Sequence, residues 1–310
     1  MPRNGMKFGV NTINFGPGTS PASLERWARF AEAVGFHLVM ISDHVAITPD
    51  VHSRYPAPFY DPFITLGWLA GITSRVELGT TVAILPYRHP LQTARMVSNL
   101  DQLSGGRFIF GIGVGWAKQE FEALAVPFDR RGRLTNEYLA AIKTLWTNDV
   151  ASFDGEFVSF KDVHTAPRAV RSPHPPIWVG GSSEGALERA VRYGDAWHPL
   201  QIRMAWLRDQ GLPRLRKIAE AAGKSVPALC PRISLLLTDS RLDDEKRLAG
   251  QGTLDQVRAD LEQLALLGAQ YVLFDTYTGR PEATLHPESD WAMLATLADK
   301  ALDLQNGTLR

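Results

Sequence analysis

Side chains that could move a proton stand where an apolar run of the sequence ends. Asp43 and His44 directly follow His37–Ser42, which is predicted to be a β-strand. A histidine at a strand end can titrate near neutral pH and serve as a general acid or base. The same pair also fits a loop cap beside a solvated imidazole. Spacing alone leaves both interpretations open, and the position at a strand end favours chemistry.

Glycines occupy every other position, at 111, 113 and 115, where a second apolar run, Arg107–Ile112, ends. Glycine has no Cβ, so main-chain N–H groups at these positions can approach a flat or charged ligand closely. As a dinucleotide fingerprint the pattern fails, because the third glycine is misplaced and no initial βαβ unit surrounds it. The pattern instead indicates a close-approach loop at a strand end, with Gly111 and Gly113 as candidate cofactor contacts.

A third loop combines glycines and hydroxyls directly before a predicted helix that begins at Glu184. Free N–H groups at a helix N-terminus, together with serine hydroxyls, form an anion site. Helix capping alone would need only one serine, and it remains the structural alternative. The candidate anion-binding residues are Gly180, Gly181, Ser182 and Ser183.

Aromatic residues near predicted strand ends suggest an apolar or aromatic substrate pocket. Tyr55 and Phe59 stand in the long loop after the second strand. For Trp197, a packed core position is an equal alternative. The candidates for the pocket itself are Tyr60, Trp116, Trp197 and His198.

Several reactive motifs are absent from the sequence. It contains no HExxH, no CxxC pair, no GxSxG and no glycine-rich loop ending in GK[ST]. The HxH pair expected near the first strand of metal-dependent barrel hydrolases is also missing. We therefore expect no metal site.

The bulk composition is that of an ordinary enzyme. With 33 basic and 33 acidic side chains among 310 residues, the chain has no net charge, which gives no reason to expect nucleic acid or an anionic membrane as partner. A single cysteine, Cys230, fits a reducing compartment, and neither a signal segment nor a membrane span is apparent. We expect a cytoplasmic location.

Eight short apolar runs alternate with amphipathic stretches, which favours a (β/α)8 barrel, with a doubly wound sheet as the alternative. We expect one domain over residues 1–310, with insertions after strands 2 and 4 at His44–Tyr60 and Val150–Pro176. The second insertion is predicted to be a hairpin turning at Asp154-Gly155, followed by a connector. The predicted strands are Lys7–Asn11, His37–Ser42, Val76–Ile84, Arg107–Ile112, Ile177–Val179, Asp195–Pro199, Arg232–Leu237 and Tyr271–Phe274. The predicted helices are Pro21–Val34, Asp61–Thr73, Leu91–Leu103, Arg131–Trp146, Glu184–Tyr193, Ala205–Ala222, Leu254–Leu267 and Asp290–Leu304.

Two segments carry a family resemblance. DQLSGGRFIFGIGVGWAKQEF (Asp101–Phe121) and GSSEGALERAVRYGDAW (Gly181–Trp197) resemble the luciferase-like flavin and deazaflavin oxidoreductases. The triplet Ser42-Asp43-His44 resembles the branch that uses the deazaflavin coenzyme F420. The resemblance implies that Asp43 and His44 lie beside the cofactor ring as catalytic residues.

The resemblance also implies further cofactor contacts. A non-prolyl cis peptide between Thr81 and Val82, after Gly79-Thr80, would form a bulge behind the cofactor ring. An ordinary strand fits these residue types equally well. The loop from Gly180 to Ser183 would hold the phosphate of the cofactor or the phosphodiester of its tail. Trp116 is a departure, because some deazaflavin dehydrogenases have a glutamate there. Glu120 is interpreted as a structural partner on the following helical turn.

The function implied first is hydride transfer between F420 and a small organic substrate. One alternative is an FMNH2-dependent monooxygenase that uses O2 and receives its flavin from a separate reductase. Another is a barrel that binds flavin without turnover. The resemblance also implies a homodimer.

Overall fold

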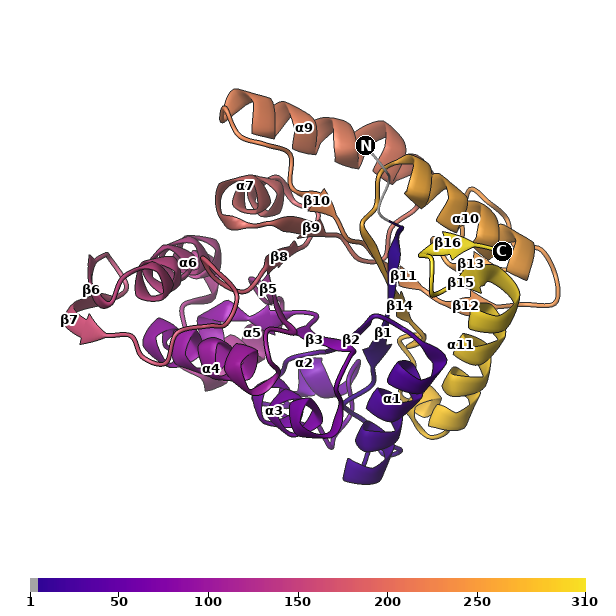
Figure 1. Cartoon of the computed structure of the whole chain (residues 1–310), viewed down its shortest axis with the longest axis horizontal. Coiled ribbons are helices and arrows are strands. Elements are labelled where there is room, and N and C mark those ends of the chain that lie inside the picture. The colour runs from indigo at the N-terminus through magenta and orange to yellow at the C-terminus, as the bar shows by residue number, and fades with distance from the viewer. Residues whose placement is uncertain (1–4) are drawn as a thin grey trace.

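Parallel strands form the centre of the molecule and helices cover them, as Figure 1 shows for the computed structural model, which describes residues 5–310. The order along the main sheet is β10-β9-β8-β5-β3-β2-β1-β14-β11, with β4 paired to β5. These strands are β1 (Lys7–Thr12), β2 (Leu38–Ile41), β3 (Glu77–Thr80), β4 (Ala83–Ile84), β5 (Phe108–Gly113), β8 (Ile177–Gly180), β9 (Ala196–His198), β10 (Ala228–Leu229), β11 (Arg232–Ser234) and β14 (Tyr271–Asp275).

The two ends of this sheet meet in the chain itself. Only Cys230 and Pro231 separate β10, which pairs with β9, from β11, which pairs with β14. Parallel bridges from Leu200 to Arg232 and from Leu229 to Ala269 continue the pairing across the junction. The sheet therefore curls back on itself, and the predicted (β/α)8 architecture is confirmed.

The helices begin and end where the sequence supplies capping residues. Ser20 and Ser23 form a capping box at α1, and Gly35 ends that helix with a φ of 101°. Asp61 caps α3 by accepting from the N–H groups of Phe63 and Ile64. The longer helices are α1 (Pro21–Val34), α3 (Pro62–Ile72), α4 (Pro90–Leu103), α6 (Arg131–Thr147), α7 (Glu184–Tyr193), α9 (Leu212–Ala221), α10 (Leu254–Leu266) and α11 (Pro287–Ala301).

Some predicted elements are divided in the structure. The strand predicted over Val76–Ile84 breaks between β3 and β4, and Arg232–Leu237 breaks into β11 and β12 (Leu236–Leu237), which pairs with β13 (Gln251–Gly252). The helix predicted over Ala205–Ala222 comprises α8 (Met204–Trp206), a wider π-type turn at Leu207–Gly211, and α9. Short helices α2 (Pro49–His52) and α5 (Lys118–Ala123) were not predicted, because runs this brief carry little periodicity.

Both predicted insertions are present. Strands β6 (Val150–Asp154) and β7 (Ser159–His164) pair as an antiparallel hairpin that projects from one end of the molecule in Figure 1. A short pair, β15 (Leu302–Asp303) and β16 (Thr308–Leu309), ends the chain.

Apolar side chains of the strands fill the interior of the barrel. The inner cluster is small and fully buried, and a larger one lies between the strands and the helices. The inner cluster comprises Leu38, Met40, Ile109, Trp178, Ala196, Cys230 and Leu273. Because these side chains fill the barrel interior, we look for the site at the carboxyl ends of the strands, where the active sites of barrel enzymes lie.

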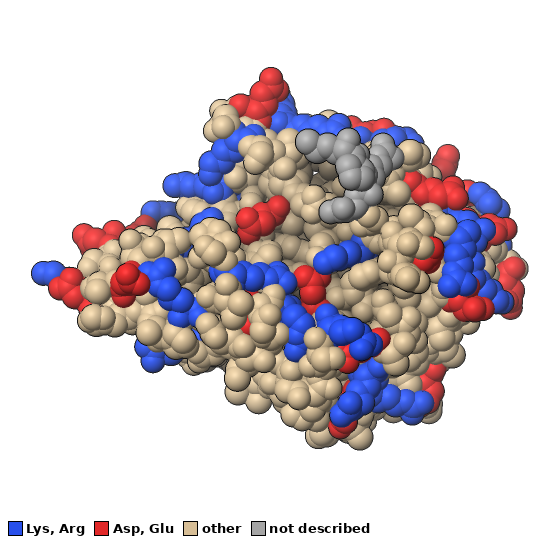
Figure 2. Space-filling model, in the orientation of Figure 1, with Lys and Arg blue, Asp and Glu red and all other residues tan. Residues whose placement is uncertain are grey.

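The surface carries both signs of charge. In Figure 2, basic and acidic side chains are interspersed across the visible face and neither sign gathers into one patch. Within residues 5–310, no helix combines the length and the apolar character needed to cross a membrane.

Candidate active site

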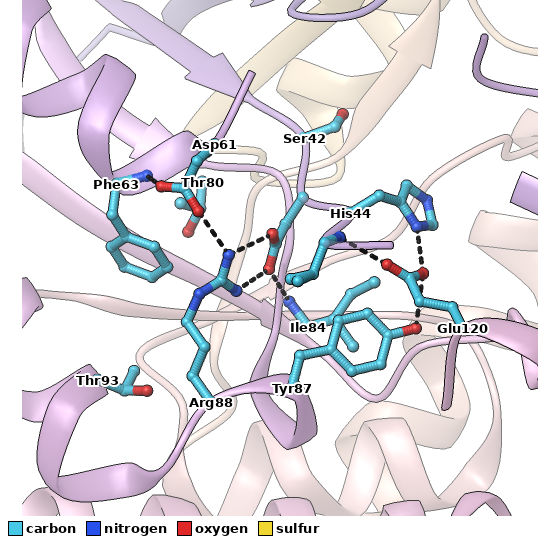
Figure 3. Close-up of polar contacts among 12 residues, drawn as sticks. Ser42, His44, Asp61, Phe63, Thr80, Ile84, Tyr87, Arg88, Thr93 and Glu120 are labelled. Atoms are coloured by element: carbon cyan, nitrogen blue, oxygen red, sulfur yellow. Dashed lines mark hydrogen bonds and ion pairs between the residues drawn. The ribbon is translucent and has the colours of Figure 1, made fainter. Parts of the chain in front are cut away.

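His44 forms a buried pair with a glutamate from a different barrel loop. Its Nδ1 lies 2.6 Å from Oε2 of Glu120, and the two side chains are 5% and 0% exposed. His44 follows β2, whereas Glu120 lies on α5 after β5, so the barrel brings together residues 76 positions apart. Figure 3 shows the imidazole and the carboxylate facing one another.

Three further donors surround the Glu120 carboxylate. Oε1 accepts from the backbone N–H groups of Val45 (2.6 Å) and Ala46 (3.0 Å), and Oε2 accepts from the Tyr87 hydroxyl (2.9 Å). Burial, followed by the nearby Glu120 charge, raises the pKa of Tyr87, so its hydroxyl remains a donor. A carboxylate that accepts from every side favours the His44 tautomer with its proton on Nδ1. Nε2, which makes no hydrogen bond to any residue between 5 and 310, is then free to accept a proton.

Asp43 is fully engaged by other groups. Arg88 donates to both of its oxygens, at 2.7 and 2.9 Å, and the N–H of Ile84 donates at 2.9 Å. The same guanidinium reaches Asp61 at 2.8 Å, as the branched contact in Figure 3 shows. Burial acts to lower the pKa of Arg88, but the two aspartates raise it above its ordinary value, which keeps the cation charged. Asp43 thus locks the strand ends beside His44, and direct contact with a cofactor stays a prediction.

The bond between Thr81 and Val82 is cis, as the resemblance implied. Glycines on the neighbouring strands make room for this bend. A Cβ on Gly111 would lie 1.9 Å from the Thr80 carbonyl oxygen, and a Cβ on Gly113 or Gly180 would lie 2.5 or 3.0 Å from the Val82 side chain. Packing against the bend is therefore sufficient reason for glycine at these three positions, and backbone contact with a cofactor stays a prediction.

A polar chain crosses the barrel beneath the bend. Arg232 donates through Nη1 to the Thr81 carbonyl at 2.8 Å and binds the Asp275 carboxylate through Nε and Nη2. Asn11 donates to the other Asp275 oxygen at 2.8 Å. On the far side, the Thr81 hydroxyl lies 2.8 Å from Nε2 of His198. The bend is thereby held by side chains from several strands.

The expectation that His198 faces an open pocket is wrong. Its side chain is fully buried, and Nδ1 contacts the Cys230 carbonyl at 2.5 Å. Burial lowers the pKa of His198 to about 4, so the ring is neutral at physiological pH. With Nδ1 donating to the carbonyl, Nε2 accepts from the Thr81 hydroxyl, which makes His198 a support for the bend.

Trp197 also lies behind the site and does not line an open pocket. It is 0% exposed, belongs to the core, and donates through its indole N–H to the Gly181 carbonyl at 2.8 Å. That bond fixes the loop before α7. Ser182 and Ser183 are exposed there, and Ser183 also caps the helix by accepting from Ala186 N–H.

Aromatic side chains surround His44 at the mouth. Ring centroids of Tyr55, Phe59 and Trp116 lie 5.3, 5.4 and 5.8 Å from the imidazole, and Trp116 is 37% exposed. Tyr60 is partly exposed, and its N–H donates to the Asn14 carbonyl. Tyr55, Phe59 and Trp116 therefore gather around His44, and their role in a substrate pocket stays a prediction. We name the group formed by His44, Tyr55, Phe59 and Trp116 the aromatic mouth.

Sequence reasoning missed the groups that orient the candidates. Glu120 lies on a helical turn as interpreted, but its partner is His44 itself. Arg88, Arg232 and Asp275 carried no motif signal, because each acts through a contact between distant loops. The one usable signal for Glu120 was its place in the GVGWAKQEF segment.

The residues at the mouth fit a flavin-type cofactor. Val82, at the bend, has a partly exposed side chain at the strand ends, and the exposed Ser182 and Ser183 at the α7 N-terminus could hold an anionic tail. Among residues 5–310, no cluster of three His, Cys, Asp or Glu side chains could hold a metal ion.

Several known proteins are similar to this chain in sequence or in fold. An uncharacterized protein of Mycobacterium bovis is 33% identical over 235 residues, which cover 71% of this chain and 80% of that protein. The FMNH2-dependent dimethylsulfone monooxygenase of Pseudomonas putida is 38% identical over 126 residues, 39% of this chain and 34% of that enzyme. The solved structure of an F420-dependent secondary alcohol dehydrogenase with an F420–acetone adduct has a TM-score of 0.75 at 17% identity, over 92% of this chain and 98% of that one.

The family profile described as luciferase-like monooxygenase matches residues 6–249, most of the chain. Similar proteins include both F420-dependent and FMN-dependent enzymes, so the similarity does not favour one cofactor over the other. The chain belongs to the luciferase-like family of flavin- and deazaflavin-dependent oxidoreductases and monooxygenases.

Proposed function

We propose that this protein transfers a hydride between F420 and a small organic substrate, with His44 moving the accompanying proton. The observation that carries the proposal is the anchored imidazole: Glu120 holds Nδ1 at 2.6 Å, and Nε2 has no protein partner among residues 5–310. Nε2 would act as the base for a substrate proton in one direction and return it in the other. Proton transfer by a positioned histidine contributes about 10²- to 10⁴-fold to rate.

The remaining site residues bind and orient. The Thr80–Val82 bend and the loops at Gly111–Gly113 and Gly180–Ser183 would position the cofactor ring and its tail. The bound deazaflavin supplies a ring carbon that takes or gives the hydride. The protein's own work is to hold the substrate's reacting carbon against that ring and to keep water out. The aromatic mouth supplies an apolar wall for both tasks.

Electrons and protons balance in this scheme. In the direction of substrate oxidation, the electron pair of a substrate C–H bond would pass as hydride to oxidised F420, and an O–H or N–H proton would pass to Nε2 of His44. In the opposite direction each step is reversed. No other oxidant is required.

A second candidate is an FMNH2-dependent monooxygenase supplied by a separate reductase. It is favoured by the 38% identity to the dimethylsulfone monooxygenase, a relative whose name states FMNH2 dependence. The two candidates differ in their need for oxygen. Hydride transfer to or from F420 proceeds without O2, whereas the monooxygenase consumes O2 and reduced FMN together.

The test incubates the protein anaerobically with reduced F420 and a panel of carbonyl and imine acceptors, following the absorbance of oxidised F420. We expect enzyme-dependent oxidation without oxygen, at a rate that His44→Asn greatly reduces. If turnover requires both FMNH2 and O2 with every substrate, the monooxygenase is the correct function. The Glu122→Gln variant, altered at an exposed position on the same helix as Glu120, serves as control.

A further inference from the structure

Arg54 lies at the rim of the aromatic mouth, where the mechanism above gives it no task. Its guanidinium lies 4.6 Å from the centre of the Trp116 ring. Trp116 in turn packs edge-on against His44. Arg54 is exposed, and within residues 5–310 no carboxylate approaches it within salt-bridge distance. An arginine stacked on an aromatic face still has the edge of its guanidinium available for a second partner.

The carboxylates around the mouth already have partners. Asp43 is held by Arg88, Glu120 by His44 and its backbone donors, and Asp275 by Arg232. Each acidic group is therefore screened by a donor or cation of the protein. An incoming ligand would meet Arg54 beside Trp116 as a cation that no carboxylate among residues 5–310 pairs with.

The backbone at Arg54 is fixed before any ligand binds. The Tyr277 hydroxyl, from the loop after β14, donates to the Arg54 carbonyl. Both Pro56 and Pro58 accept from the N–H of Gly16, at 2.9 and 2.8 Å. Loops after three different strands thus clamp the segment that carries the cation, and a preorganised site loses little entropy on binding.

A cluster of aromatic rings by itself offers ring faces and edges to either a flat apolar molecule or an organic cation. Arg54 distinguishes these, because it already occupies one face of Trp116 with positive charge and would repel a second cation. A carboxylate, by contrast, can pair with the guanidinium edge through two parallel hydrogen bonds. The Tyr55 hydroxyl, which has no hydrogen-bond partner among the described residues, adds a neutral polar group within the aromatic mouth.

We infer that the substrate is a flat, conjugated or aromatic carboxylate, whose ring lies in the aromatic mouth and whose carboxylate pairs with Arg54. This inference rests on the proposed function, because it names the substrate class of the same site. Arg54 is thus a specificity-determining residue, with Trp116 packed between it and His44.

Equilibrium binding of 2-naphthoate and of its neutral isostere 2-naphthamide, measured by calorimetry, tests the inference. We expect wild-type protein to prefer the carboxylate, and salt to weaken naphthoate binding alone. Arg54→Gln should reduce naphthoate affinity about tenfold or more and change naphthamide affinity less than twofold. Arg54→Lys keeps the positive charge but loses the two parallel N–H donors of the guanidinium, so its naphthoate affinity should lie between those of wild type and Arg54→Gln. Arg216→Gln, on the exposed side of α9, should bind naphthoate as wild type does.

The cofactor's anionic tail is the other possible source of a negative group at Arg54, so F420 affinity is measured in the same variants. If Arg54→Gln weakens F420 binding and leaves naphthoate binding unchanged, the substrate assignment is overturned. Equal binding of naphthoate and naphthamide, or no binding of naphthoate, also overturns it. If naphthoate behaves as expected but neither F420 nor FMN binds, the proposed function fails and the carboxylate site stands.

Discussion

His44 acquires its chemical role from side chains that lie far from it in the sequence. Glu120 accepts four hydrogen bonds, from two backbone N–H groups, the Tyr87 hydroxyl and the imidazole. This arrangement fixes the ring orientation and leaves Nε2 toward the mouth. The pair therefore resembles other enzyme dyads in which a buried carboxylate orients a histidine and stabilises its protonated form.

Removing the imidazole or its anchor should have separable effects. We expect His44→Asn to lower turnover about 10²- to 10⁴-fold with cofactor affinity nearly unchanged. Glu120→Gln should lower turnover less and shift the pH profile, because it keeps the shape but removes the charge. The exposed neighbour Glu122→Gln should behave as wild type. Steady-state kinetics against pH measure these effects, and a His44→Asn enzyme with full activity would contradict the assignment.

His198 makes stability depend on pH. Its pKa is about 4 in the folded protein and ordinarily 6.5, so between these values the unfolded chain binds more protons than the native state. The free energy of unfolding should therefore fall as the pH drops from 7 to 4, by as much as about 3 kcal/mol from this residue. Arg232 works in the same direction, because its charge opposes protonation of the ring.

Urea unfolding at several pH values checks this expectation. In His198→Gln the free energy of unfolding should fall between pH 7 and pH 4 by about 3 kcal/mol less than it does in wild type. His164→Gln, at an exposed position on the β6–β7 hairpin, provides the control and should leave the slope unchanged. Identical slopes for wild type and His198→Gln would refute the buried, neutral imidazole.

Among the elements, the strand ends around the Thr81–Val82 bend are the most tightly fitted. The Cβ of alanine at position 111 would lie 1.9 Å from the Thr80 carbonyl oxygen, which is backbone and cannot swing aside. Gly111→Ala should therefore destabilise the fold by about 1–3 kcal/mol and weaken cofactor binding by displacing the bend.

Gly132 on α6 supplies a matched control, since a Cβ there would meet only the end of the Arg189 side chain, at an ordinary contact distance of 3.7 Å. Gly132→Ala should stabilise the protein by up to roughly 0.5–1 kcal/mol, because alanine favours helix. Thermal unfolding of both variants, with cofactor titration, makes the comparison. If Gly111→Ala were as stable as wild type, close packing would not explain glycine at this position.

Much of this architecture could be predicted from local sequence signals. Alternating apolar runs, the caps at Ser20 and Asp61, and the turn at Asp154-Gly155 each act over a few residues, so the sequence reports them directly. The break within Val76–Ile84 could be expected only through family resemblance. The roles of Trp197 and His198 could not be predicted, because whether a strand-end side chain faces the mouth or the core depends on the packing of neighbouring strands.

For the molecule as a whole, α3 provides the surface to which we assign the expected homodimer. The helix is apolar on all sides, with Ile64 77% exposed and Trp68 38% exposed. A helix of this kind is normally covered. Sedimentation equilibrium should report a dimer that Ile64→Glu dissociates. Leu266→Glu, at a 76% exposed position on α10, should leave the assembly intact. A monomeric wild-type protein would contradict the assignment.

The function that we propose requires a deazaflavin to bind at the barrel mouth beside His44. Titration of the purified protein with oxidised F420 and, separately, with FMN tests it most directly, with tryptophan fluorescence as the signal, since Trp116 lies at the mouth. We predict saturable quenching by F420 at concentrations where FMN has little effect, with Trp116→Phe reducing the signal. Saturable quenching by FMN alone would contradict the account.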